Sequence, residues 1–215
     1  MMQPDLFGTA RPDVLLSAGA LFLPDFARAQ VGRLHAHIQS IAAGSPFRHM
    51  LTPGGRCMSV ATTSCGSFGW TSGRGGYRYM AFDPETRQAW PHMPPIFREL
   101  AYQAAARAGF AEFRPDTCLV NRYAPGARLS LHQDLDEGDM NAPIVSVSLG
   151  LPAVFLWGGA ERRDPRRRIT LCEGDVMVWG GDSRMNFHGV EPVQAAAGAG
   201  EHGACRYNLT FRKAR

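Results

Sequence analysis

The chain has 215 residues, of which 45% are hydrophobic and 20% charged, with a formal net charge of +4, an ordinary globular composition that can bury one substantial core. Its five cysteines are odd in number and lack CxxC spacing, which argues against a disulfide framework or a zinc knuckle and favours a reducing cytoplasm. The chain does not begin with a basic segment followed by an apolar one, and no apolar run approaches the about 18 residues of a membrane span, so we expect neither a signal peptide nor a membrane partner.

Two amphipathic helices are predicted in the first half of the chain. A short apolar strand at 20–23 precedes a helix predicted over 24–43, in which apolar residues recur every three or four positions. A second helix is predicted over 95–108, after two prolines and before Gly109. Helices of this kind would buttress a sheet, and we assign them no chemistry.

Between the helices, residues 45–92 are rich in Gly, Ser, Thr, Arg and aromatic residues, with strand-like pieces at 56–64 and 76–82. They hold too few apolar residues for a core of their own, so we expect a flap on the main domain. A solvated loop region explains this composition, and so does a nucleic-acid surface with arginines for phosphates and rings for bases. All 23 basic residues except Lys213 are arginine, which also hints at an anionic partner.

From Thr117 onward the chain is predicted to form consecutive short strands joined by Gly and Pro turns, which indicates a sandwich or barrel, here a jelly roll. A loose surface loop is expected at 195–203. The predicted strands are 117–124, 130–134, 144–151, 153–157, 168–172, 176–179 and 206–212.

His132 and Asp134 are two residues apart in a strand-like segment, so alternation would place both on one face, where they could chelate one ion. The alternative is that His132 and Asp134 are a chance pair on the protein surface that binds no metal. His188 follows a later strand and could complete a set of two imidazoles and one carboxylate, which favours iron(II) over structural zinc. The remaining histidines are expected to be ordinary surface or packing residues: His35, His37, His49, His92 and His202.

The last strand carries polar residues at every second position, and an earlier strand has the same spacing. An amphipathic edge strand whose polar face is exposed to solvent would show the same alternation. If this face lined the interior, however, its two arginines would be costly to bury without an anion. A small dicarboxylate would satisfy both guanidiniums, and next to a metal it points to 2-oxoglutarate. The residues concerned are Arg206, Asn208, Thr210 and Arg212, with Asn121 and Tyr123.

Several motifs together resemble the bacterial AlkB family, from about residue 45 to the C-terminus. The resemblance implies a double-stranded β-helix and an iron(II)- and 2-oxoglutarate-dependent dioxygenase that uses O2. The motifs are Asn-Arg-Tyr-Ala-Pro-Gly at 121–126, His-Gln-Asp-x-Asp at 132–136, the strand 143–150, Gly-Asp-Val-x-Val-Trp-Gly-Gly at 174–181, Arg-Tyr-Asn-Leu-Thr-Phe-Arg at 206–212, and Thr-Pro-Gly-Gly at 52–55 with Gly-Trp at 69–70.

The resemblance also implies roles for single residues. The iron ligands would be His132, Asp134 and His188. The distal carboxylate of 2-oxoglutarate would be held by Arg206 and Tyr123, and its metal-chelating end would lie near Arg212, Asn208 and Asn121.

For the substrate, Trp70 would stack on a flipped-out damaged base with His132 on the opposite face, and Asp136 would lie near the exocyclic amine of the base. Tyr77 and Thr52 would contact the substrate strand. Arg162 would lie at the rim of the base pocket, so the flap would be a nucleotide-recognition lid.

Some positions depart from the family pattern or match nothing in it. Leu135 stands where a basic residue would help to hold phosphate, and the loop at 193–203 matches nothing of use. The arginines at 166–168 are better explained as a solvated turn than as a phosphate contact.

The predicted fold is therefore α+β and mainly β, a jelly roll buttressed by helices. One dioxygenase domain would span 1–215, with an N-terminal extension and helix (1–44), the lid (45–92) and a helix plus catalytic core (93–215). The implied activity is oxidative demethylation of 1-methyladenine and 3-methylcytosine, with formaldehyde released.

The expected partner is single- or double-stranded alkylated DNA, with RNA also considered, and the expected state is a monomer in the cytoplasm. The same chemistry on RNA, protein or a small molecule stays open. A nucleic-acid-binding module without catalysis and a zinc hydrolase are weaker alternatives: the first leaves the triad and the dicarboxylate pocket without a use, and the second lacks a general base.

Overall fold

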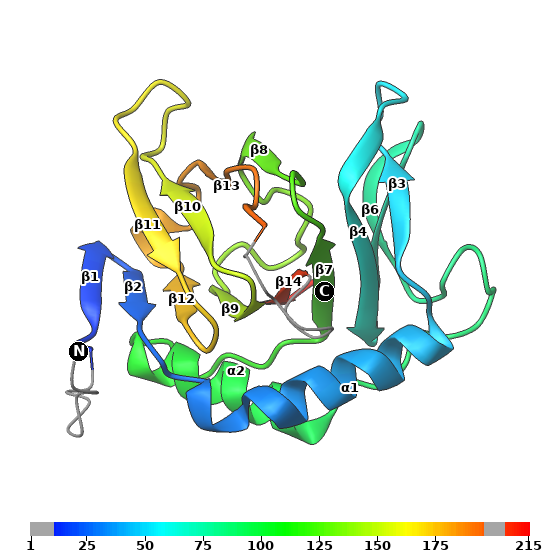
Figure 1. Ribbon diagram of the computed structural model, residues 1–215, viewed down its shortest axis with the longest axis horizontal. Coiled ribbons are helices and arrows are strands. Elements are labelled where there is room, and N and C mark those ends of the chain that lie inside the picture. Colours follow the sequence, from blue (N-terminus) through cyan, green and yellow to red (C-terminus); the bar gives the residue numbers. More distant parts are fainter. Residues whose placement is uncertain (1–10, 196–204) are drawn as a thin grey trace.

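The computed structural model describes residues 11–195 and 205–215. Within these residues, strands form a large sheet, a small sheet and a separate hairpin, with helices along one side (Figure 1). The large sheet has the order β1 (Val14–Ser17), β2 (Ala20–Leu23), β12 (Val176–Trp179), β9 (Ile144–Gly150), β14 (Arg206–Arg212), β7 (Thr117–Tyr123), β4 (Cys57–Gly66) and β3 (Arg48–Leu51).

The small sheet lies on the side of the large sheet away from the helices (Figure 1). An apolar cluster that includes Phe155, Trp157 and Trp179 fills part of the space between the two sheets. This arrangement confirms the prediction of a mainly β fold built from two facing sheets with helices attached. The small sheet has the order β11 (Arg167–Leu171), β10 (Ala153–Trp157), β13 (His188–Val190) and β8 (Leu129–His132), and the hairpin consists of β5 (Gly69–Gly73) and β6 (Gly76–Met80).

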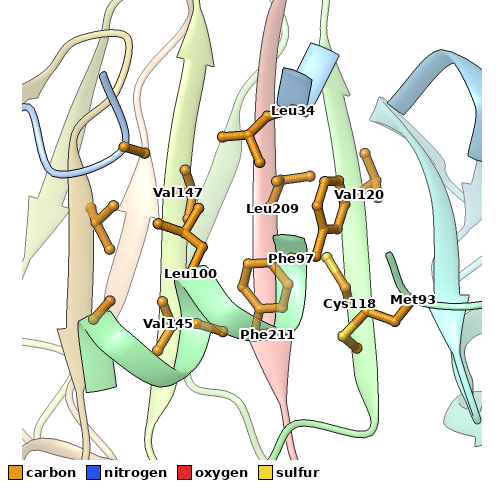
Figure 2. Close-up of a cluster of buried hydrophobic side chains, with 14 of the residues drawn as sticks. Leu34, Met93, Phe97, Leu100, Cys118, Val120, Val145, Val147, Leu209 and Phe211 are labelled. Carbon is orange, nitrogen blue, oxygen red and sulfur yellow. The ribbon is translucent and has the colours of Figure 1, made fainter. Parts of the chain in front are cut away.

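The two α-helices, α1 (Val31–Gly44) and α2 (Pro95–Arg107), cover the outer side of the large sheet. Figure 2 shows side chains of both helices lying against strands β9, β14 and β7. The members of this cluster are almost completely buried, and burial of apolar area on this scale stabilises the fold. They include Leu34, Phe97, Leu100, Val120, Val145, Val147, Leu209 and Phe211.

The start of the first helix was predicted wrongly. Residues 24–27 form a turn, a short 3-10 helix follows (Arg28–Gln30), and α1 begins only at Val31. Asp25 adopts a positive φ of 56° and its N–H donates to the Asp175 carboxylate at 2.9 Å. The turn is thus held by the distant loop between β11 and β12, a contact that local helix propensity does not register.

The region 45–92 is not wholly a flap. Strands β3 and β4 extend the large sheet, because β4 pairs with β7 in an antiparallel register, and only the hairpin β5–β6 stands apart from it. Strands β1, β3, β5 and β13 were not predicted. Most of the loop expected at 195–203 and the histidine at 202 lie outside the described residues.

No helix in the described part of the chain is long and apolar enough to cross a membrane.

Candidate active site

Two neighbouring strands bring the predicted metal ligands together. His188 opens β13 and pairs across the ladder with His132 at the end of β8, so their ring centroids lie 4.4 Å apart. Asp134 follows β8 rather than lying within it, which corrects the prediction of a strand over 130–134. Its carboxylate nevertheless turns back toward both rings, at 3.7 Å from His132 Nε2 and 3.5 Å from His188 Nε2.

Backbone carbonyls orient both imidazoles. His132 Nδ1 lies 2.9 Å from the Ser130 carbonyl and His188 Nδ1 lies 3.0 Å from the Asn186 carbonyl. Each Nδ1 must carry the proton to donate to a carbonyl, which leaves the Nε2 lone pairs facing Asp134. Burial and the neighbouring His188 lower the pKa of His132 to about 4, so the ring is neutral near pH 7, the form that binds a metal.

The Asp134 carboxylate is ionised and only partly satisfied. Burial opposes ionisation, but Arg212 and the two histidines outweigh it and hold the pKa of Asp134 well below its usual value. Arg212 Nη2 donates to Oδ1 at 2.9 Å, whereas the buried Oδ2 has no hydrogen-bond partner among the described residues. An unpaired carboxylate oxygen beside two imidazole nitrogens suits a divalent cation, and the donor set without thiolates favours iron(II).

The even-numbered residues of β14 form the floor of the cavity, as their alternation predicts. Arg206 and Asn208 lie directly across the ladder from Tyr123 and Asn121 of β7. Asn121 Nδ2 donates to Asn208 Oδ1 at 3.2 Å, and Thr210 Oγ1 donates to the same atom at 2.7 Å. This amide network holds the floor in one arrangement.

Arg206 lies on this floor without an anionic partner. It is only 1% exposed and donates to Ser148 Oγ at 3.0 Å, while its Nε and Nη1 have no partner among the described residues. Burial lowers the pKa of Arg206, which shows the cost of this charge without a counter-ion. Burial also raises the pKa of Tyr123 to about 12, so its hydroxyl remains a donor. A carboxylate would satisfy both groups, and the residues therefore fit the distal end of 2-oxoglutarate.

One cavity of about 670 Å³ joins the metal-ligand cluster, the floor and the lid residues. Trp70 of β5 stacks on Tyr77 of β6 with ring centroids 5.4 Å apart, and its Nε1 donates to Asp136 Oδ2 at 3.0 Å. Arg162 lies at the rim, where Nη2 donates to the Leu131 carbonyl at 2.9 Å.

Thr52 also lines this cavity, although its hydroxyl accepts the Arg56 N–H at 3.1 Å. Every site residue predicted from the sequence thus borders a single cavity. Among the described residues, His132, Asp134 and His188 are the one group of three or more His, Cys, Asp or Glu side chains that could hold a metal ion.

Sequence reasoning missed three buried residues beside the cavity. Glu137 accepts hydrogen bonds from Tyr79 and Arg184, at 2.7 and 2.9 Å. The available signal was the position of Glu137 at the end of 134–137, where three of four residues are acidic. Nothing in local spacing marks Arg184 or Tyr79, because their contacts come from distant segments.

Comparison with known proteins agrees with this geometry. Residues 19–212 match the 2OG-Fe(II) oxygenase superfamily. The chain is 54% identical to the alpha-ketoglutarate-dependent dioxygenase AlkB of Escherichia coli (strain K12), over 98% of this chain and 97% of that protein. It is 45% identical to the AlkB homolog of Caulobacter vibrioides (strain NA1000 / CB15N), over 84% of this chain and 81% of the homolog.

A solved structure of OsALKBH1 is similar with a TM-score of 0.79 and 27% identity, and it covers 94% of this chain and 100% of its own. The fold is thus the double-stranded β-helix of these oxygenases, as predicted. The chain belongs to the 2OG-Fe(II) oxygenase superfamily and, within it, to the AlkB family of iron(II)- and 2-oxoglutarate-dependent dioxygenases.

Proposed function

We propose that this dioxygenase repairs alkylated DNA by removing methyl groups from bases such as 1-methyladenine and 3-methylcytosine. The observation that carries the proposal is the shared cavity. It joins a two-histidine, one-carboxylate cluster to a floor that has a buried unpaired arginine and to an aromatic and acidic rim. The floor suits a dicarboxylate, and the rim suits a flat, positively charged ring.

In this proposal the ligands of iron(II) are His132, Asp134 and His188. Arg206 and the Tyr123 hydroxyl bind the distal carboxylate of 2-oxoglutarate, because both are buried donors that have no carboxylate partner. The metal-chelating end of the co-substrate lies near Arg212, Asn208 and Asn121.

When bound, iron and 2-oxoglutarate supply the oxidation, in which O2 is consumed, succinate and CO2 are formed, and the N-methyl carbon is hydroxylated and lost as formaldehyde. The protein residues position the groups that react. The protonated Nδ1 atoms of His132 and His188 keep both Nε2 atoms facing the metal site.

The substrate base must leave the helical stack, because its methyl carbon is unreachable in a duplex. Trp70 on one side and His132 on the other form the walls between which the base stacks. A methylated adenine or cytosine carries a positive charge, which the carboxylates of Asp134 and Asp136 favour over a neutral ring. Tyr77 and Thr52 contact the substrate strand, and Arg162 borders the base.

We further infer one dioxygenase domain over 1–215, in which the β5–β6 hairpin within 45–92 acts as the nucleotide-recognition lid, and a monomer that works in the cytoplasm. The exposed arginines near the cavity, such as Arg56 and Arg128, give the surface the charge that a nucleic acid requires. DNA is the proposed substrate, and RNA is the alternative to compare with it.

The test is release of formaldehyde and succinate from a 3-methylcytosine oligonucleotide, with iron(II), 2-oxoglutarate and oxygen. Stoichiometric release of both is expected, with little formaldehyde from the unmethylated oligonucleotide. Matched DNA and RNA oligonucleotides rank the two substrates. No formaldehyde from any methylated oligonucleotide, despite bound iron and 2-oxoglutarate, would refute the proposal.

Replacing Trp70 by alanine tests the base-binding wall. Stacking on an aromatic ring contributes about 1–3 kcal/mol per base, so we expect the KM for the oligonucleotide to rise about tenfold or more, with a smaller change in the affinity for 2-oxoglutarate. The matched control is Phe82→Ala, because Phe82 is an exposed aromatic just beyond β6 that does not line the cavity. Equal effects of the two variants would contradict the assigned wall.

A further inference from the structure

Glu137 is a buried carboxylate that the proposed reaction does not use. Its side chain is 3% exposed, and three groups converge on it. The Tyr79 hydroxyl donates to Oε1 at 2.7 Å, Arg184 Nη2 donates to Oε2 at 2.9 Å, and Arg212 Nε lies 3.2 Å from Oε1. Burying a carboxylate this deeply is unfavourable unless it is paired and hydrogen-bonded.

The contact with Arg212 bears on the co-substrate site. Arg212 donates through Nη2 to Asp134 Oδ1 at 2.9 Å, and its Nε forms an ion pair with Glu137 Oε1 that lacks hydrogen-bond geometry. A guanidinium is planar and rigid, so anions on two of its edges fix where the third edge points. Glu137 thus places a second carboxylate beside Arg212, while Asp134 Oδ2 has no hydrogen-bond partner among the described residues.

Arg184 holds this arrangement from a different segment of the chain. Its Nη1 donates to the Asp134 carbonyl at 2.9 Å, and Arg184 lies in the segment that leads to His188. The side chain of Gln133 reaches the same segment, since its Nε2 donates to the Met185 carbonyl at 2.6 Å. The two segments that carry the three proposed metal ligands are therefore cross-linked by Arg184 and Gln133.

Tyr79 connects Glu137 to the β5–β6 hairpin. Tyr79 lies directly across the hairpin from Trp70, and Trp70 donates to Asp136, the residue next to Glu137. Burial raises the pKa of Tyr79, so its hydroxyl stays a donor. Two opposed residues of the hairpin thus bind two consecutive acids in the segment that follows Asp134.

We infer that Glu137 is a positioning residue that orients Arg212 for 2-oxoglutarate and, through Tyr79, makes the affinity for 2-oxoglutarate depend on the β5–β6 hairpin. The inference rests on the proposed role of Arg212 at the chelating end of the co-substrate. It differs from a purely structural role, in which Glu137 would stabilise the fold without affecting ligand affinity.

The experiment compares Glu137→Gln with a matched control, Asp83→Asn. Asp83 is 1% exposed and forms a buried ion pair with Arg48 outside the cavity, so its variant should lose stability in a similar way. The readout is the dissociation constant of 2-oxoglutarate for the manganese(II)-loaded protein, measured by calorimetry with oxygen excluded. The melting temperature of each variant is measured in parallel.

For Glu137→Gln we expect 2-oxoglutarate binding to weaken about tenfold. This is the effect of losing one charge-assisted hydrogen bond from a misoriented Arg212 to the co-substrate. For Asp83→Asn we expect a lower melting temperature and a dissociation constant within about twofold of the parent. The positioning role is overturned if Glu137→Gln binds 2-oxoglutarate as the parent does, or if both variants weaken it equally.

Tyr79→Phe tests the link to the hairpin, because it removes one hydroxyl and keeps the ring. We expect 2-oxoglutarate binding to weaken about threefold, which corresponds to one neutral hydrogen bond; unchanged binding would overturn this link. These measurements need neither oligonucleotide nor turnover. A parent that binds 2-oxoglutarate but releases no formaldehyde therefore refutes the proposed substrate and leaves the role of Glu137 to be decided by its own variants.

Discussion

The two sides of strand β14 differ completely, although they belong to the same seven residues. On the helix side, Leu209 and Phe211 are fully buried in an apolar cluster, where Phe211 meets Phe97 of α2 edge-to-face with centroids 5.9 Å apart (Figure 2). On the cavity side, Arg206 and Arg212 are also buried, but they are charged. Burial by itself therefore does not distinguish a structural face from a functional one.

What distinguishes the two sides is whether the buried groups are satisfied. The helix side needs only close apolar contacts, and it has them. The cavity side leaves nitrogen atoms of Arg206 and an oxygen atom of Asp134 without partners, a cost that the fold bears until ligands arrive. Substitutions on the cavity side should therefore affect ligand binding and turnover, whereas substitutions on the helix side should affect stability. The largest expected effect comes first.

His132→Ala should abolish turnover on the cavity side. It removes one of three proposed metal ligands, and changes to groups that merely support such ligands already cost about 10- to 100-fold, so we expect a loss beyond that range. Formaldehyde release and manganese(II) affinity measure it. His49→Ala is the control, because His49 is exposed on β3 and lies outside the cavity. Substantial activity in His132→Ala would contradict the assigned cluster.

Phe211→Ala should instead lower the stability of the protein, because Phe211 lies in the apolar cluster on the helix side of β14. Removing a buried phenylalanine ring leaves a cavity and typically costs about 3–5 kcal/mol of unfolding free energy, measured by urea denaturation. Phe211→Leu keeps most of the volume and should cost less than about 2 kcal/mol. If both variants unfold at the same urea concentration as the parent, the contact between the helices and the sheet is not a main source of stability.

Arg206→Met should have effects of opposite sign on binding and on stability. We expect 2-oxoglutarate binding to fall by about 2–3 kcal/mol, because two charge-assisted hydrogen bonds are lost. The ligand-free protein should be as stable as the parent or more stable, since an unpaired buried charge is removed. Arg122→Met is the control, because Arg122 lies over Phe47 on the other side of β7. A clear drop in ligand-free stability for Arg206→Met would show that this arginine is satisfied without an anion.

The stability of the metal-free protein should depend on pH because of His132, which lies on the cavity side. The pKa of His132 is about 4 in the folded protein and about 6.5 when unfolded. Between these values the unfolded chain binds more protons, so the stability of the metal-free protein falls as pH decreases through this window. We expect a loss of about 1–2 kcal/mol between about pH 7 and pH 5.

His132→Gln should remove this part of the pH dependence, and Phe211→Leu should keep the parental slope, because the helix-side cluster around Phe211 is apolar. Urea denaturation at the two pH values measures both. A parental slope in His132→Gln would assign the effect to another group.

Much of the fold follows from local patterns. Alternation along 206–212 predicted which side chains of β14 share a face, and the structure confirms it. The apolar spacing after Pro95 likewise predicted α2, because a helix buries every third or fourth residue. Such patterns are local, and they can be read wherever one face of an element is buried.

The errors have non-local causes. The chain at Asp25 forms a turn because the Asp175 carboxylate accepts its N–H. Strand β4 joins the large sheet because β7 offers a free edge to pair with. Glu137 went unnoticed because Tyr79, Arg184 and Arg212, which surround it, come from three separate segments.

The sequence by itself determined the types of the reacting groups: two imidazoles, a carboxylate, two arginines on one strand face and an aromatic and basic lid. Only the tertiary structure decided that they share one cavity. The reason is physical: His132 and His188 meet through the pairing of β8 with β13, and Glu137 meets Tyr79, Arg184 and Arg212 only because three distant segments pack around it. Spacing along a chain specifies the side to which a residue points, whereas pairing between strands specifies which residue it meets.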